Sequence, residues 1–213
     1  MKTRSKALLL TLCAVLLVAA SVLGTMAYLT STDTVTNTFT VGSVAIKLDE
    51  AQANTDGTLV PNAERVKANS YKLLPGHTYN KDPMVTVLSG SEPSYVKMTV
   101  TFSKANELDA IFAPGGADLT KIFNGYDPAN WTYKDNTTDV TANTRTYEFW
   151  YKEAVGAPDG DVALDALFDS ITVPGSVTKE QLATIEGMTI TVNAYAIQAD
   201  GFADADAAWA AFN

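Results

Sequence analysis

The sequence contains a single cysteine and a single histidine in 213 residues. Zinc fingers, iron–sulfur clusters and disulfide frameworks each need several such residues, so these classes are excluded. Positive charge is also scarce, because 24 Asp and Glu residues outnumber 15 Lys and Arg residues and give a net charge of −9. A nucleic-acid-binding protein normally presents a basic surface, and this composition argues against one. An apolar fraction of 46% nevertheless predicts a folded core.

Catalytic motifs are missing as well. The chain has no His-Glu-x-x-His zinc motif, no Gly-x-Ser-x-Gly nucleophile elbow and no phosphate-binding glycine loop. We expect His77 to be solvated in a turn, because it follows Pro75-Gly76. Carboxylates occur in close pairs, which we expect in solvated turns and helix caps rather than across a substrate cleft. These pairs are Asp159 with Asp161, Glu148 with Glu153, and Asp204 with Asp206. The sequence therefore predicts a protein that is not an enzyme and has no cofactor and no metal site.

The N-terminus has the composition of an export signal. Three cations within the first six residues precede an apolar run from Ala7 to Leu23, and Gly24 interrupts that run. Small residues follow at the −3 and −1 positions of a cleavage site between Ala27 and Tyr28. The alternative is a retained transmembrane anchor, but a run of seventeen residues, apolar except for Thr11 and Ser21, lies at the lower limit for crossing a bilayer. We therefore expect residues 1–27 to be a signal peptide and the protein to be secreted or held at the cell surface, with membrane contact only before cleavage.

Cleavage at this site would change the chemistry of the chain. It would remove three basic residues, no acidic residue and the only cysteine, so the mature protein could form no disulfide. Exported proteins without disulfides are consistent with a Gram-positive bacterium.

Residues 28–41 alternate with a strict period of two. Threonine occupies every even position from 30 to 40, and the other phase includes Leu29, Val35, Phe39 and Val41. This alternation predicts a β-strand with one threonine face and one partly apolar face. The strand could pair within its own domain or be donated to another subunit.

For the rest of the chain, residues 42–213, the sequence predicts one domain of short strands. We expect strands at 44–48, 84–88, 95–102, 131–134, 145–152 and 188–198, with polar connections at 50–70 and 135–144. Helical turns are expected at 118–125, at 164–168, after a Thr178/Gln181 capping box, and after an Asp204 cap. Many short strands with helices confined to the connections predict an all-β antiparallel sandwich or barrel.

Three sets of short motifs resemble the TasA/camelysin family of exported Gram-positive proteins. The junction at 24–33 is similar to the family's Gly-Thr-x-Ala-aromatic-aromatic-Ser-Asp pattern, with Leu29 in place of an aromatic residue. It continues into an Asn-x-Phe-x-x-Gly stretch at 37–42. The other sets are 74–76 with 95–97, and 194–202 with 207–209.

The resemblance implies a jelly-roll sandwich, processing by a SipW-type signal peptidase, and assembly of the protein with itself into biofilm matrix fibres. In such fibres the N-terminal strand of one subunit completes the sheet of its neighbour, which assigns Leu29, Val35, Phe39 and Val41 to the polymerisation strand. Some family members carry a metallopeptidase description under the camelysin name, but this chain has no zinc motif to support that activity.

Three hypotheses for the function therefore follow from the sequence. The first is a structural protein that polymerises into extracellular matrix fibres by donor-strand exchange. The second is a camelysin-like surface metallopeptidase. The third is a monomeric surface adhesion or carbohydrate-binding module that uses exposed aromatic residues such as Trp131 and Trp150.

Overall fold

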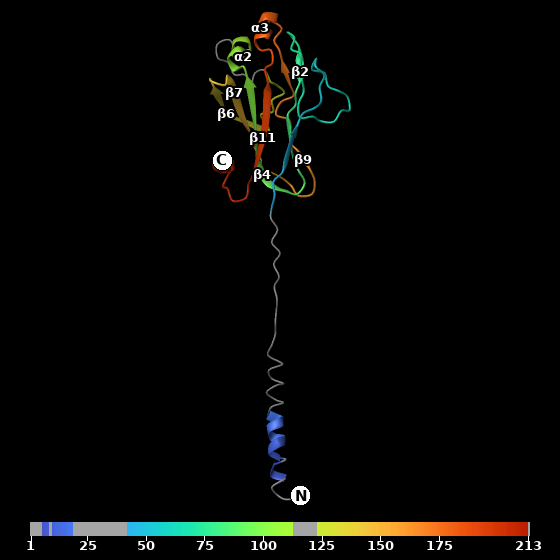
Figure 1. Ribbon diagram of the computed structural model, residues 1–213, viewed down its shortest axis with the longest axis vertical. Helices are drawn as coiled ribbons and strands as arrows, with labels where there is room; N and C mark the ends of the chain where they lie inside the picture. Colours follow the sequence, from blue (N-terminus) through green and yellow to red (C-terminus); the bar gives the residue numbers. More distant parts are fainter. Residues whose placement is uncertain (1–5, 9, 19–41, 113–122, 213) are drawn as a thin grey trace. The chain divides into compact units, whose positions relative to one another are not determined.

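The protein divides between Val41 and Gly42 into two units (Figure 1). The computed structural model describes residues 6–8, 10–18, 42–112 and 123–212. In the N-terminal unit, the described residues are helical and carry exposed leucine and valine side chains. No helix among the described residues has the length and hydropathy that crossing a membrane requires.

A five-stranded antiparallel sheet forms one layer of the C-terminal unit. Its order is β11 (Ile190–Gln198), β4 (Ser91–Ser103), β7 (Thr144–Tyr151) and β6 (Trp131–Asp139), and the short β8 (Val155–Ala157) also pairs with β4. The inward residues of β4 alternate along the strand and are fully buried, namely Val96, Met98, Val100 and Phe102. The predicted period-two strand at 95–102 is confirmed, and the strand extends beyond it at both ends.

Two three-stranded sheets form the other layer. One has the order β1 (Ile46–Asp49), β3 (Met84–Val87) and β9 (Val162–Ala163). The other has the order β2 (Thr78–Asn80), β10 (Ser170–Thr172) and β5 (Phe123–Asn124). One continuous apolar core joins this layer to the five-stranded sheet. The prediction of an all-β antiparallel sandwich is confirmed.

The helices lie in the connections, as predicted. Helix α3 (Lys179–Thr184) begins with the expected capping box, in which Thr178 and Gln181 satisfy each other's backbone amides. Helix α4 (Ala205–Ala211) begins at Asp204, whose carboxylate accepts from the Ala207 amide at 2.8 Å. Helix α2 (Ala105–Phe112) has no counterpart among the predicted elements.

Three local predictions are wrong. Residues 118–122 of the helix predicted at 118–125 lie outside the described residues, and Phe123 belongs to strand β5, where its ring stacks on Phe168 at 4.1 Å. The turn predicted at 164–168 is irregular, because the amides of Leu164 and Leu167 bond to Val85 and Pro83 instead of forming a helix. The polar run 135–144 is mostly strand, since β6 continues to Asp139.

Candidate functional site: the groove between β1 and β11

Two edge strands face each other along one side of the sandwich. β1 ends one sheet and β11 ends the other, and they lie close to each other. Between them lies a groove of about 1270 Å³, which we call the β1–β11 groove. Its walls are the end of β1 with the loop 67–75, and α3 with the first half of β11. The apolar residues that line it include Leu48, Leu73, Leu74, Leu182, Ile185, Met188, Ile190 and Val192.

The inner face of β11 is incompletely buried. Its four inward residues are Ile190, Val192, Ala194 and Ala196, and all of them are only partly buried. They pair in register with Phe102, Val100, Met98 and Val96 of β4, which are all fully buried. Ile46 and Leu48 of β1 are partly buried in the same way. The core is therefore covered everywhere along β4 and left partly open between β1 and β11.

The free edge of β11 suits the addition of another strand. Among the described residues, no strand other than β4 pairs with it. Its nine residues carry no charge, and they pair with β4 without a register shift. An unprotected strand edge offers backbone amides and carbonyls to any extended segment that reaches it.

The opposite edge of the same sheet is protected. β6 is exposed along most of its length, and it contains Lys134, Asp135 and Asp139. Its pairing with β7 is interrupted between Tyr133 and Asp135. Charges and bulges are the means by which edge strands resist pairing with other chains. The sheet therefore has one protected edge and one open edge.

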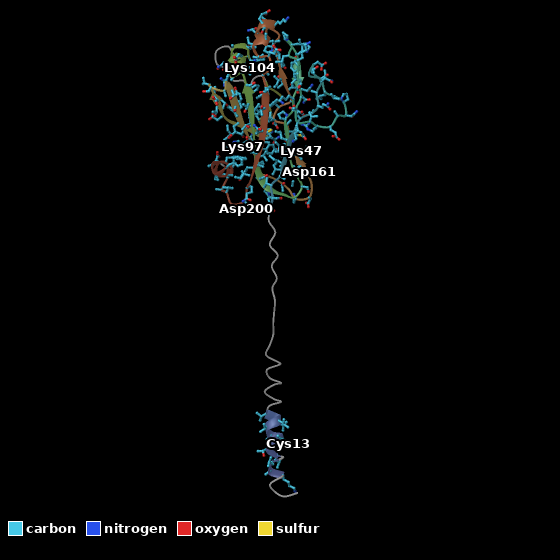
Figure 2. All side chains as sticks on the ribbon, viewed as in Figure 1. Cys13, Lys47, Lys97, Lys104, Asp161 and Asp200 are labelled. Carbon is cyan, nitrogen blue, oxygen red and sulfur yellow. The ribbon has the colours of Figure 1, made fainter. Side chains whose placement is uncertain are left out.

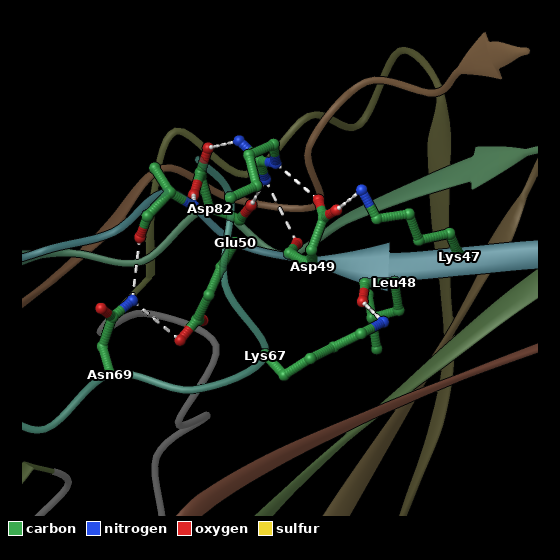
Figure 3. Close-up of polar contacts among 9 residues, drawn as sticks. Lys47, Leu48, Asp49, Glu50, Lys67, Asn69 and Asp82 are labelled. Carbon is green, nitrogen blue, oxygen red and sulfur yellow. Dashed lines mark hydrogen bonds and ion pairs between the residues drawn. The ribbon is translucent and has the colours of Figure 1, made fainter. Parts of the chain in front are cut away.

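An ion-pair network fixes the β1 wall of the groove (Figure 3). The Arg65 guanidinium binds Asp49 at 2.5 Å and Asp82 at 2.8 Å. Lys47 lies 2.7 Å from the other Asp49 oxygen, and the Lys67 amine donates to the Leu48 carbonyl. Burial raises the pKa of Asp49, but hydrogen bonds to Lys47 and Arg65 outweigh it and hold the pKa below its ordinary value. The loop that carries Arg65 and Lys67 is thus tied to β1 by charge-assisted bonds.

The first residues of the C-terminal unit, to which the N-terminal extension (residues 1–41) is attached, lie at the pole opposite the groove (Figure 2). Ser43 forms a parallel bridge with Ser91 and accepts a hydrogen bond from the Glu92 amide at 2.9 Å. A Cβ at position 42 would lie 2.8 Å from the Glu92 side chain, which explains the glycine there. Figure 2 places Asp161 and Asp200 toward this pole and Lys104 toward the opposite one.

The charges of the two poles differ in sign. Lys67, Lys72 and Lys179 are exposed on the lining of the groove, where Glu186 is the one exposed acid. Asp159, Asp161 and Asp200 are exposed in turns near the other pole. A subunit therefore presents a basic groove at one end and an acidic surface at the end from which its N-terminal extension leaves.

The sequence-predicted site residues are only partly described by the structure. Ala27, Tyr28, Leu29, Val35, Phe39 and Val41 lie outside the described residues. His77 is exposed beside the Pro75-Gly76 turn, as predicted. Among the described residues, no group of three His, Cys, Asp or Glu side chains is placed to hold a metal ion.

The aromatic residues considered for an adhesion surface differ from expectation. Trp131 is fully buried, and its indole Nε1 donates to the Asp165 carbonyl at 3.0 Å, so the prediction that it is exposed is wrong. Trp150 lies on the outer face of the sheet, where the Lys134 amine covers its ring at 3.9 Å and Trp209 packs beside it.

No protein-family model, curated protein or solved structure matches the chain. The relation to the TasA/camelysin family therefore stays a prediction from the short motifs.

Sequence reasoning did not identify the groove. Its two walls come from segments more than 100 residues apart in the chain, and no local sequence pattern indicates that they meet. The one available signal was the uncharged alternation of residues 190–198, which is unusual for an edge strand.

Proposed function

We propose that this protein is an exported structural subunit that polymerises into extracellular matrix fibres by donor-strand exchange. Residues 28–41 of one copy would occupy the β1–β11 groove of the next and add a strand to β11. One observation carries the proposal: the uncharged edge of β11, which no other described strand pairs with, lies above a row of partly buried apolar residues.

The N-terminal segment has the length and alternation that the groove requires. It has fourteen residues, and β11 has nine, which span about 30 Å at roughly 3.3 Å per residue. Leu29, Val35, Phe39 and Val41 share one phase and would cover the partly buried inner row of β11, while the threonines would face outward. Backbone hydrogen bonds would supply affinity, and the apolar side chains would select the register.

The polarity of the domain supports head-to-tail assembly. The groove lies at one pole and the extension leaves at the other. A contact between two different surfaces of the same subunit is heterologous, and it produces an open filament unless the rotation closes a ring. The lysines on the groove and the acidic turns at the far pole would favour the same orientation.

Export accounts for the N-terminal unit in this proposal. The described helical residues there expose leucine and valine side chains rather than packing them in the core. An apolar helix of this kind, after a cationic start, is suited to a signal peptide. Cleavage at Ala27 by a peptidase of the SipW type would release the donor segment and prevent assembly inside the cell.

The experiment compares the mature chain 28–213 with a variant that lacks residues 28–41. We expect the mature chain to form fibres visible by electron microscopy, and the shortened variant to stay a folded monomer by circular dichroism and size-exclusion chromatography. A synthetic 28–41 peptide should bind the shortened variant and inhibit fibre growth by the mature chain. The proposal fails if the shortened variant forms fibres at the same rate, or if the mature chain stays monomeric at high concentration.

A further inference from the structure

A lysine, a carboxylate and an asparagine meet beneath the loop 67–75. The Lys81 amine lies 2.5 Å from one oxygen of Glu50, and the side-chain amide of Asn69 donates to the other oxygen at 3.0 Å. Figure 3 shows the Asn69 side chain directed at the Glu50 carboxylate. A single carboxylate therefore holds a primary amine and a primary amide on its two oxygens.

Both polar atoms of the Asn69 side-chain amide form hydrogen bonds. Its carbonyl oxygen accepts from the backbone amide of Ala53 at 2.9 Å, and its nitrogen also donates to the Ala51 carbonyl at 2.8 Å. A hydrogen bond to a carbonyl oxygen polarises the carbonyl and stabilises the negative charge that develops there when a nucleophile adds to the carbon. Asn69 is thus fixed in orientation and activated at the atom where charge would form.

The ion pair of the cluster is almost fully buried, and Asn69 is half-buried where the cluster meets the β1–β11 groove. Glu50 is 5% exposed and Lys81 is 8% exposed. Tyr71 lies close enough to interact with the charge of Glu50, and its hydroxyl donates to the carbonyl of Asn80 at 2.6 Å. Burial and the charge of Glu50 raise the pKa of the Tyr71 hydroxyl. A low-dielectric, water-poor site strengthens proton transfer between the groups inside it and protects an amide from hydrolysis.

We propose that Lys81 and Asn69 condense into an intramolecular isopeptide bond, with Glu50 as the general acid and base. Glu50 takes a proton from the Lys81 ammonium, and the lone pair of Nζ then attacks Cγ of Asn69. The Ala53 amide stabilises the resulting oxyanion. Glu50 returns this proton to Nδ2, the Cγ–Nδ2 bond breaks with its electron pair on nitrogen, and ammonia leaves. Nζ then gives up its remaining extra proton through Glu50 to the departing ammonia. The products are one new amide and one ammonium ion, with no oxidant or other reactant.

The other charged clusters of the domain lack this arrangement. Lys47 pairs with Asp49, and Arg65 pairs with Asp49 and Asp82, but no side-chain amide shares those carboxylates in the described contacts. The bond would also stabilise one wall of the groove. It would fasten the loop 67–75, a wall of the β1–β11 groove, to the end of β2 in a mature chain that has no cysteine for a disulfide.

The intact mass of the folded mature chain without substitutions tests whether the isopeptide bond has formed. We expect a mass lower than that of the sequence by one molecule of ammonia. Trypsin should then fail to cleave after Lys81 and should release the peptides 68–72 and 73–97 joined through their side chains. A full sequence mass with normal cleavage after Lys81 would overturn the proposal. Loss of water would also overturn it, since that would indicate a bond from lysine to a carboxylate.

Three variants identify the groups. Lys81→Met and Glu50→Gln should restore the full mass of the respective variant, while Lys47→Met, which removes another lysine from a carboxylate pair, should keep the ammonia deficit. Circular dichroism establishes that each variant is folded. A persistent deficit in folded Glu50→Gln would refute the role of Glu50. The bond is independent of polymerisation, so this mass measurement and the fibre assay fail separately.

Discussion

A charge placed on the inner face of β11 should separate folding from assembly. Val192 is half-buried in the β1–β11 groove, and the adjacent Asn193 is exposed on the opposite face of the same strand and is not part of the groove lining. Val192→Asp and Asn193→Asp therefore introduce the same group one residue apart, one into the groove and one into solvent. Only the first would be covered by an incoming strand.

The magnitudes follow from the burial of the two side chains. Full burial of a valine contributes about 2 kcal/mol, so Val192→Asp should destabilise the isolated domain by about 1 kcal/mol, because its carboxylate stays solvated in the open groove. In the fibre the same carboxylate would be buried without a partner, which costs about 3 kcal/mol. That penalty weakens subunit association roughly a hundredfold, since each 1.36 kcal/mol is a factor of ten.

The assay measures two quantities for each variant of the mature chain. Denaturant unfolding of the form lacking residues 28–41 gives the stability of the domain, and sedimentation gives the critical concentration for fibres. Val192→Asp should raise the critical concentration steeply with a small stability change, and Asn193→Asp should change both little. Equal critical concentrations for the two variants would refute strand addition at β11.

Three further predictions concern the donor segment, processing and acid stability. Phe39→Asp should impair fibre growth more than Thr38→Asp, because only the former places a charge on the phase that would enter the groove; equal effects in a turbidity assay would exclude this orientation. N-terminal sequencing of secreted protein should begin at Tyr28, and a start at residue 1 would contradict the signal peptide. The folded-state pKa of Asp49 lies below its ordinary value of 3.8, so its contribution to stability is present above that pH and is lost as the pH falls through the lowered value. Arg65→Ala should remove part of it, destabilising the domain by about 2 kcal/mol at pH 7 and less at pH 2, as measured by urea unfolding at both pH values.

Local signals were enough to predict the central strands and the helix caps. Residues 96–102 alternate because one face of β4 packs in the core, and Thr178 and Asp204 cap helices through their own side chains. The length of strand β6 was underestimated because most of its residues beyond Trp131 are exposed. Its sequence therefore lacks the apolar alternation that indicates a strand. Phe123 was misassigned because its partners, Phe168 and Ile171, lie more than 40 residues away and decide its conformation.

The candidate site was not accessible to the same reasoning. Grooves, and clusters such as Lys81 with Glu50 and Asn69, depend on the approach of separate segments after folding. The donor segment could be recognised from its alternation, whereas its receptor required the three-dimensional arrangement of β1 and β11.

The protected edge of β6 has a consequence for the material that the subunits would form. In the proposed assembly, each subunit has two binding functions, one groove and one donor segment, and the charged, irregular edge of β6 supplies no third one. Monomers with two functions grow as linear chains, without branches or sheets. A subunit that lacks residues 28–41 retains a groove but has no segment to donate, so it would act as a chain stopper. The ratio of intact to shortened subunits would then set the average fibre length. Proteolytic removal of the N-terminal segment would therefore change the mechanical properties of the matrix.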